Sequence, residues 1–229
     1  MHWSFPAWKR TVPLAVMRAQ LDAQALGALE KRFDFARWEG ECGEQDWRES
    51  LYVLDVVSRV MPSDVPAGRA LDVGSKNGCY LPGLATAVPR GWDAVELDAH
   101  RRYLWGSTRR VYGERMARAF PECRFHCGDV RQLQGPWAVV TWFLPFVTPE
   151  PLEAWGLSAD AFAPEALLRH VVERVVPGGV LFVVNQGEHE AEVQAGLFKK
   201  VGVEAKSLGR IESALSPFKK PRFGFLVRH

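Results

Sequence analysis

Residues 70–80, ALDVGSKNGCY, form the segment of the chain with the clearest chemical content. An apolar run that predicts a buried strand contains one acid, Asp72, and leads into a turn bounded by Gly74 and Gly78. Glycines at such a turn allow the backbone to approach a ligand closely. The carboxyl ends of parallel strands are where open α/β sheets bind ligands. The turn is therefore a candidate cofactor site, and Lys76 stands where nucleotide-binding loops often have another glycine.

Two nucleotide-binding motifs do not fit this turn. The dinucleotide pattern Gly-x-Gly-x-x-Gly, counted from Gly74, requires glycine at the positions of Lys76 and Cys79. A carboxylate just before the loop, at Asp72, is also unfavourable for a pyrophosphate. The chain contains no Gly-x-x-x-x-Gly-Lys-Ser/Thr sequence, so a phosphate loop for ATP is excluded.

The segment LDVGSKNG resembles the first motif of the class I S-adenosylmethionine-dependent methyltransferases, acid-x-Gly-x-Gly-x-Gly. Asp72, Gly74 and Gly78 match this motif, and Lys76 departs from it. The resemblance implies S-adenosylmethionine as cofactor. It places the whole loop in the cofactor site, with Ser75, Lys76 and Asn77 between the matching residues. The ammonium and sulfonium of this cofactor favour a nearby carboxylate, and its own carboxylate suits backbone N–H groups at a helix start.

Further segments resemble the same family in the same order along residues 68–229. In WDAVELDAH, Glu96 ends the second expected strand and is implied to bind the ribose hydroxyls, with Asp98 as the rival position. In RFHCGDVRQL, Asp129 is implied to accept from the adenine amine. Leu97 and Val130 are implied to lie against the adenine ring.

The fourth and fifth expected strands complete the resemblance. In WAVVTWFLPF, Thr141 and Trp142 are implied to face the methionine end of the cofactor or the acceptor. VVPGGVLFVVN resembles the helix end and fifth strand that are frequent in this family. We expect the acceptor side to be built by the N-terminal helical region, the connection 146–164 and the loop 185–192.

Strands that alternate with helices along the chain predict a doubly wound α/β fold. We expect a mostly parallel seven-stranded sheet with helices on both faces, an antiparallel last strand and an N-terminal helical cap. The expected domains are the cap, 1–66, and an S-adenosylmethionine-binding domain, 67–229. The expected strands are 70–73, 93–97, 123–127, 137–144, 180–185, 203–208 and 222–229, and the main helices of the second domain are 80–88, 101–120, 164–176 and 188–202.

Composition narrows the functional classes. The net charge of +2 is too small to predict binding to nucleic acid or a membrane, and no segment has the length and hydrophobicity of a membrane span. The four cysteines lack zinc-site spacing, so no metal site is expected. We expect a cytoplasmic protein. The arginines of 101–110 and the KKPR segment 219–222 are expected to be solvated, with RNA contact as the alternative.

The predicted reaction is methyl transfer from S-adenosylmethionine by in-line displacement. Such a reaction needs alignment more than acid–base groups, so catalytic residues are hard to see in a sequence. Glu188 and His189 are the candidates for a base. A small molecule is the expected acceptor and DNA is disfavoured. An RNA methyltransferase and a methyltransferase-like binding or scaffold protein without catalysis remain alternatives, while the sequence leaves the acceptor and the oligomeric state open.

Overall fold

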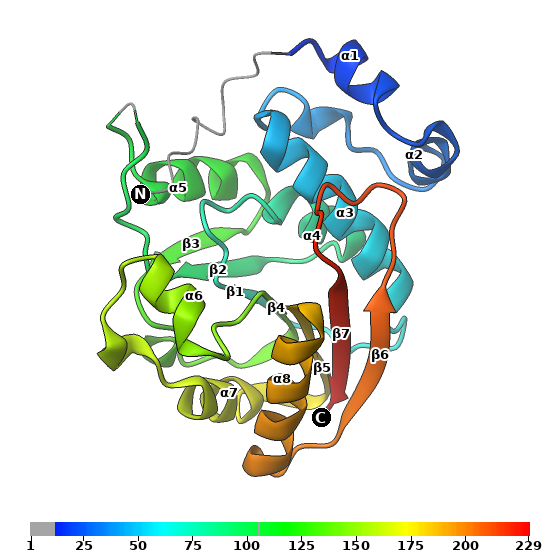
Figure 1. Cartoon of the computed structure of the whole chain (residues 1–229). Coiled ribbons are helices and arrows are strands. Elements are labelled where there is room, and N and C mark those ends of the chain that lie inside the picture. Colours follow the sequence, from blue (N-terminus) through cyan, green and yellow to red (C-terminus); the bar gives the residue numbers. More distant parts are fainter. Residues whose placement is uncertain (1–11, 105) are drawn as a thin grey trace.

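A single seven-stranded β-sheet organises the computed structural model (Figure 1), which describes residues 12–104 and 106–229, apart from the side chain of Arg37. The strands are β1 Ala70–Val73, β2 Trp92–Glu96, β3 Arg124–Cys127, β4 Trp137–Phe143, β5 Val175–Gln186, β6 Ala205–Ile211 and β7 Arg222–Arg228. The α-helices are α1 Leu14–Ala19, α2 Ala23–Glu30, α3 Glu44–Val60, α4 Leu81–Ala87, α5 Arg109–Ala119, α6 Pro149–Ala154, α7 Pro164–Val172 and α8 Gly187–Val201. Short 3-10 turns are η1 Ala36–Trp38, η2 Val130–Gln132 and η3 Ala159–Ala161.

The strand order β3-β2-β1-β4-β5-β7-β6 makes the sheet doubly wound. The winding reverses between β1 and β4, which are parallel neighbours, so a crevice forms beyond their carboxyl ends. β7 alone runs antiparallel, pairing with β5 on one side and β6 on the other. The predicted mostly parallel seven-stranded sheet with an antiparallel last strand is confirmed.

Both faces of the sheet are covered by helices (Figure 1). Alternate residues of the central strands enter two separate hydrophobic cores. Val180 and Phe182 pack toward α3 and α4, whereas Leu181 and Val183 pack toward α7 and α8. This arrangement explains why the central strands read as continuous apolar runs instead of alternating patterns.

The N-terminal helical region contributes to the core. Trp47, Leu51 and Leu54 of α3 are fully buried in the cluster that also contains Leu84 of α4 and Val139 of β4. Residues 1–11 of the predicted cap lie outside the described residues. The boundary between residues 66 and 67 stays a prediction.

Two helix predictions are wrong in their bounds. The helix expected over 101–120 begins only at Arg109, because Arg102 and Thr108 pair in an isolated bridge around a turn and the Thr108 side chain caps the helix. The helix expected over 164–176 ends at Val172. β5 starts at Val175, since the segment with Gly178 and Gly179 continues the strand.

No helix in residues 12–104 and 106–229 combines the length and hydrophobicity needed for a membrane span. This finding covers helices alone, within those two described ranges.

The close approach of α3 and α4 generates a stability prediction at Gly83. A Cβ built on Gly83 would lie 2.4 Å from the backbone oxygen of Ser50 in α3, and backbone cannot move aside cheaply. We expect Gly83→Ala to lower the free energy of unfolding by roughly 2–4 kcal/mol despite the higher helix propensity of alanine. Chemical denaturation measures this change.

Gly196→Ala in α8 is the matched control, since nothing lies within 4 Å of a Cβ at that position. There the propensity gain acts alone, and we expect stabilisation of up to about 1 kcal/mol. Equal effects of the two substitutions would contradict the close packing of α3 on α4.

Candidate functional site

A pocket of ≈390 Å³ lies at the carboxyl ends of the parallel strands, over the point where the winding reverses. Its volume is within the range of small-molecule sites. The predicted cofactor-site residues that line it are Gly74, Lys76, Glu96, Leu97, Asp129, Val130 and Trp142. The three segments expected on the acceptor side also reach it, through Gln45 and Glu49, through several residues from Phe146 to Ala163, and through Gln186 and Glu190.

The loop after β1 is held in shape by β2. The backbone N–H groups of Gly74 and Ser75 both donate to the carbonyl oxygen of Val95, and that of Lys76 donates to Glu96 Oε2 at 2.8 Å. Gly74 has φ +71° and faces open space on its Cβ side. A ligand can therefore approach the backbone there, as the glycine pattern predicts.

Lys76, which departs from the glycine pattern, is accommodated in the loop by its backbone conformation and by an ion pair. Its backbone takes the left-handed conformation, φ +53°, that glycine would adopt. Its side chain is directed neither into solvent nor freely into the pocket, because Nζ pairs with Glu49 Oε2 of α3 at 2.9 Å and lies over the ring of Tyr80. The loop is thus fastened to α3 by an ion pair.

Glu49 is 2% exposed, so this ion pair governs its ionisation. Burial alone would raise the pKa of Glu49, but the Lys76 ammonium outweighs burial and holds the pKa below its ordinary value. Burial likewise opposes the charge on Lys76, and Glu49 raises the pKa of the lysine well above its ordinary range. Both groups are therefore charged at neutral pH, and their charges cancel within the pocket wall.

Glu96 is the central acceptor of the predicted ribose position. It lines the pocket and accepts from the backbone N–H of Lys76, from the backbone N–H of Asp98 and from Arg109 Nη1 at 3.2 Å. Burial raises the pKa of Glu96 despite the nearby guanidinium. The carboxylate is held rigidly by these donors, and its remaining lone pairs can accept from ligand hydroxyls.

The three residues predicted at the adenine all line the pocket. Asp129 is the N-cap of η2 and lines the pocket together with Val130 and Leu97. Burial opposes its ionisation, but hydrogen bonds from Arg131 lower the pKa of Asp129, so it is a charged acceptor. Leu97 is 39% exposed and contributes apolar surface to the pocket lining.

Several predicted cofactor-site residues lie behind the pocket wall. Asp72 and Thr141 are neighbours in β1 and β4, both fully buried, and the Thr141 hydroxyl donates to Asp72 Oδ1 at 2.8 Å. Burial raises the pKa of Asp72 to about 7. The backbone N–H groups of Gly74, Ser75 and Lys76 bond to β2 and not to Asp72. Ser75, Asn77 and Gly78 also lie outside the pocket lining.

Trp155 is a pocket-lining residue that connects two segments of the chain. It lies just after α6 and stacks against the guanidinium of Arg109 at 4.3 Å and that of Arg101 at 5.1 Å, and Arg101 also donates to its backbone carbonyl. Trp155 also meets Phe146 edge to face at 5.6 Å. The connection after β4 is thereby fixed to the β2–α5 loop and forms part of the pocket wall.

Glu190 replaces Glu188 and His189 as the candidate base. Glu188 and His189 do not line the pocket, whereas Glu190, one residue further along the first turns of α8, does. Glu190 Oε2 accepts from the backbone N–H of Gln186, and burial raises the pKa of this carboxyl group. The helical spacing decides which of three neighbouring polar residues faces inward, and the short sequence GEHEAE does not reveal it.

Two arginines expected at solvated faces are buried. Arg109 is 7% exposed beside Glu96, and Arg222 of the KKPR segment is 6% exposed and lines the pocket with Phe218. Sequence reasoning missed Arg222 as a site residue. The antiparallel pairing of β7 with β5 puts Arg222 opposite Gln186, at the edge where the parallel strands end.

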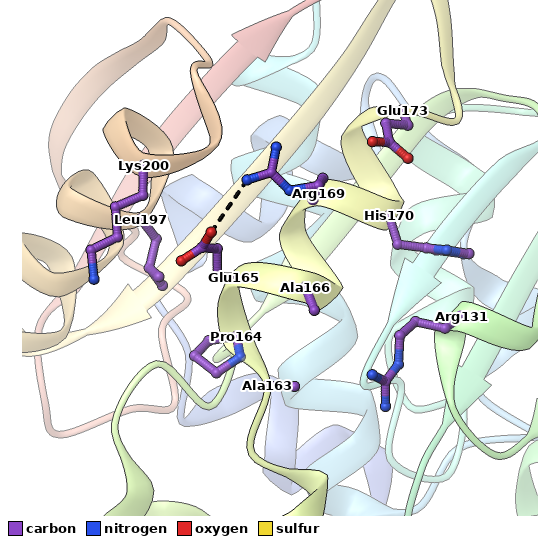
Figure 2. Close-up of a pocket in the computed structure, with 10 residues that line it drawn as sticks. All are labelled: Arg131, Ala163, Pro164, Glu165, Ala166, Arg169, His170, Glu173, Leu197 and Lys200. Carbon is purple, nitrogen blue, oxygen red and sulfur yellow. Dashed lines mark hydrogen bonds and ion pairs between the residues drawn. The ribbon is translucent and has the colours of Figure 1, made fainter.

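A second hollow, of ≈590 Å³, lies between α7, α8 and η2 (Figure 2). Figure 2 shows Arg131 and His170 on one side of it and Lys200 on the other, with Glu165 paired to Arg169 between them. It is away from the glycine loop, and most of its charged groups have partners on their own elements. The first pocket is therefore the candidate site. In the described part of the chain, no cluster of three or more side chains suited to a metal ion occurs.

Several solved structures of methyltransferases are similar to this chain in fold. An amino pentose methyltransferase from Micromonospora echinaspora, bound to S-adenosylmethionine, matches 79% of this chain and 91% of its own at 17% identity, with a TM-score of 0.52. A TehB-like S-adenosylmethionine-dependent methyltransferase from Corynebacterium glutamicum matches 80% and 94% at 16% identity and a TM-score of 0.51. An O-methyltransferase family protein from Burkholderia thailandensis matches 81% and 59% at 15% identity and 0.51.

The chain has the class I methyltransferase fold. No family model and no curated protein matches the sequence. At these identities the likeness concerns the fold, and the reaction must be argued from the pocket.

The ion pair between Lys76 and Glu49 generates a double-mutant prediction. Lys76→Gly leaves Glu49 buried without its cation, so we expect a loss of roughly 2–3 kcal/mol in the free energy of unfolding at pH 7. Lys76→Gly combined with Glu49→Gln is expected to recover most of this loss, because no buried charge is left unpaired. Urea denaturation of Lys76→Gly, Glu49→Gln and the double variant measures the coupling.

Glu122→Gly is the control for the backbone effect. Glu122 also has a left-handed backbone, φ +59°, but its side chain is exposed and forms no ion pair with the described residues. Relief of the left-handed conformation alone makes that substitution neutral or stabilising. Loss of stability in Lys76→Gly no greater than in Glu122→Gly would contradict a role of the ion pair.

The buried carboxyl group of Asp72 generates a pH prediction. Its pKa of about 7 lies above the unfolded value, so the folded state binds a proton that the unfolded state releases between about pH 4 and 7. Stability from this group is complete below pH 4 and is lost as the pH rises to 7. In the wild type, we expect this group to lower the free energy of unfolding by on the order of 2–4 kcal/mol as the pH rises. In Asp72→Asn, this decrease should be absent because the amide does not ionise.

Denaturant unfolding at pH 5 and pH 8 measures the difference, with the exposed Glu204→Gln as control. Asp46, whose pKa burial also raises to about 7, contributes the same background in every variant. If Asp72→Asn shows the same loss between the two pH values as the wild type, Asp72 is ionised in the folded protein at both.

Proposed function

We propose that the protein transfers the methyl group of S-adenosylmethionine to a small-molecule acceptor. The observation that carries this proposal is the convergence of the glycine loop, Glu96 and Asp129 on one pocket at the reversal point of a methyltransferase fold. The pocket fits the cofactor chemically. It combines exposed loop backbone at Gly74, a fixed carboxylate for hydroxyl groups and an acceptor beside an apolar wall.

In this proposal Glu96 binds the ribose hydroxyls, and Asp129 accepts from the adenine amine with Leu97 and Val130 against the ring. The methionine end lies along the loop from Gly74 to Lys76 and toward Trp142. The cofactor supplies an activated methyl group on a sulfonium. The chain then has to align the acceptor and exclude water, which the fixed, pocket-lining Trp155 favours.

Glu190 is the proposed base when the acceptor must lose a proton. It lines the pocket, its burial raises its pKa toward the range useful at neutral pH, and its hydrogen bond from Gln186 fixes its position. A small acceptor is favoured over RNA because Arg109 and Arg222 are buried in the site instead of forming a basic surface. The backbone of Lys76, which follows the path a glycine would take, supports a working cofactor loop over a retired one.

Calorimetric titration with S-adenosylmethionine and with S-adenosylhomocysteine tests the cofactor assignment. We expect both to bind, and Glu96→Gln to weaken both at least about tenfold, which corresponds to the loss of hydrogen bonds to a charged acceptor (~1.5 kcal/mol). Glu204→Gln, an exposed carboxylate away from the pocket, should bind as the wild type does.

Absence of heat and of any thermal shift at millimolar concentration of both ligands would overturn the proposed function. Binding with unchanged affinity in Glu96→Gln would keep the cofactor but reject the ribose role of Glu96.

A further inference from the structure

Arg222 is a buried cation inside the candidate site. It is 6% exposed, and as the first residue of β7 it pairs with Gln186 at the carboxyl edge of the sheet. It lines the pocket together with Gln186, Glu190 and Phe218. A buried charge is costly unless it is paired. The hydrogen-bond partners of this guanidinium therefore indicate its role.

Its partners leave one edge of the guanidinium free. Nη1 donates to the side-chain oxygen of Gln186 at 3.0 Å and to the backbone oxygen of Lys220 at 3.4 Å. Within residues 12–104 and 106–229 nothing accepts from Nε or Nη2, and Arg222 forms no ion pair. These two nitrogens make the side edge of the guanidinium fork.

The same edge binds a carboxylate elsewhere in this chain. Arg69 donates from Nε and Nη2 to the two oxygens of Asp93, at 2.9 and 3.0 Å. Such paired, parallel hydrogen bonds are the preferred geometry between arginine and a carboxylate. Arg222 presents this fork without an occupant among the described residues.

The free nitrogens are open to the pocket. Buried side-chain atoms that are both sealed and unpartnered occur at several places in the described chain, but Nε and Nη2 of Arg222 are not among them. A residue that is 6% exposed and lines the pocket thus keeps these two donors accessible there. Burial lowers the pKa of Arg222, so an anion bound at this edge replaces solvation that the fold has removed.

The surroundings favour a single negative charge on an apolar body. The guanidinium stacks on Phe218 at 4.3 Å, and Trp142, Phe146 and Trp155 also line the pocket. Four carboxylates line the pocket, and three of them are paired with a cation: Glu49 with Lys76, Glu96 with Arg109 and Asp129 with Arg131. The fourth, Glu190, accepts from the backbone N–H of Gln186. One unpaired arginine beside Glu190 suits a carboxylate better than a doubly charged phosphate.

We propose that Arg222 recognises the methyl acceptor through a carboxylate, and that the acceptor is an aromatic carboxylic acid. This inference rests on the proposed function, since it assigns the acceptor side of the same pocket. The carboxylate pairs with Nε and Nη2 of Arg222, its ring lies among the aromatic side chains, and its nucleophilic atom is directed toward Glu190. Arg222 is a specificity-determining residue in this scheme.

Binding of small acids to the protein saturated with S-adenosylhomocysteine tests the proposal. The probes are benzoate, 4-hydroxybenzoate and 3-phenylpropanoate, and calorimetry compares each acid with its carboxamide. Phenyl phosphate is a fourth probe, which tests whether the site prefers a phosphate. We expect at least one acid to bind at least tenfold more tightly than its amide. Arg222→Gln should remove this preference, and Arg222→Lys should reduce it because lysine keeps the charge but lacks the fork.

Controls separate the possible causes of failure. Arg210→Gln, at an exposed position of β6, should leave both ligands unaffected. Both Arg222 variants should bind S-adenosylhomocysteine within about twofold of the wild type, which also shows that they fold. If that nucleoside does not bind the wild type, the proposed function fails.

If the nucleoside binds and no acid is preferred over its amide, or if phenyl phosphate binds and the acids do not, the inference about Arg222 fails alone. A preference for acids that persists in Arg222→Gln would also overturn it.

Discussion

The loop after β1 needs hydrogen-bond acceptors for its backbone N–H groups, and it must also leave part of its backbone accessible to a ligand. β2 supplies the acceptors, because the carbonyl of Val95 and the carboxylate of Glu96 accept from three consecutive loop residues. The backbone at Gly74 remains accessible. The rest of the site is arranged around this contact, since it fixes Lys76 toward α3 and Glu96 beside the glycines.

Glu96 also connects two parts of the pocket. It accepts from Arg109, and Arg109 stacks on Trp155, which lines the pocket and belongs to the connection after β4. The end of β2 and the connection after β4 are therefore linked through two side-chain contacts.

Patterns within short segments predicted most of the fold, and contacts between distant segments limited the prediction of the site. The alternation of strands and helices and the glycine loop predict the sheet, its winding and the pocket at Gly74. The sequence pattern predicts Arg222 in a solvated basic segment, whereas its burial depends on an antiparallel pairing with β5 that no local pattern encodes. The choice of Glu190 over His189 likewise depends on the rotation of α8 about its axis.

Lys76 shows how such a distant contact alters the meaning of a motif. The position tolerates a side chain because the left-handed backbone is compatible with it and Glu49 neutralises its charge inside the wall. The two residues, 27 positions apart in the chain, therefore constrain each other's substitutions. Replacing either one alone leaves the other charge without its partner, so only a paired exchange at positions 49 and 76 keeps the pocket wall electrically neutral.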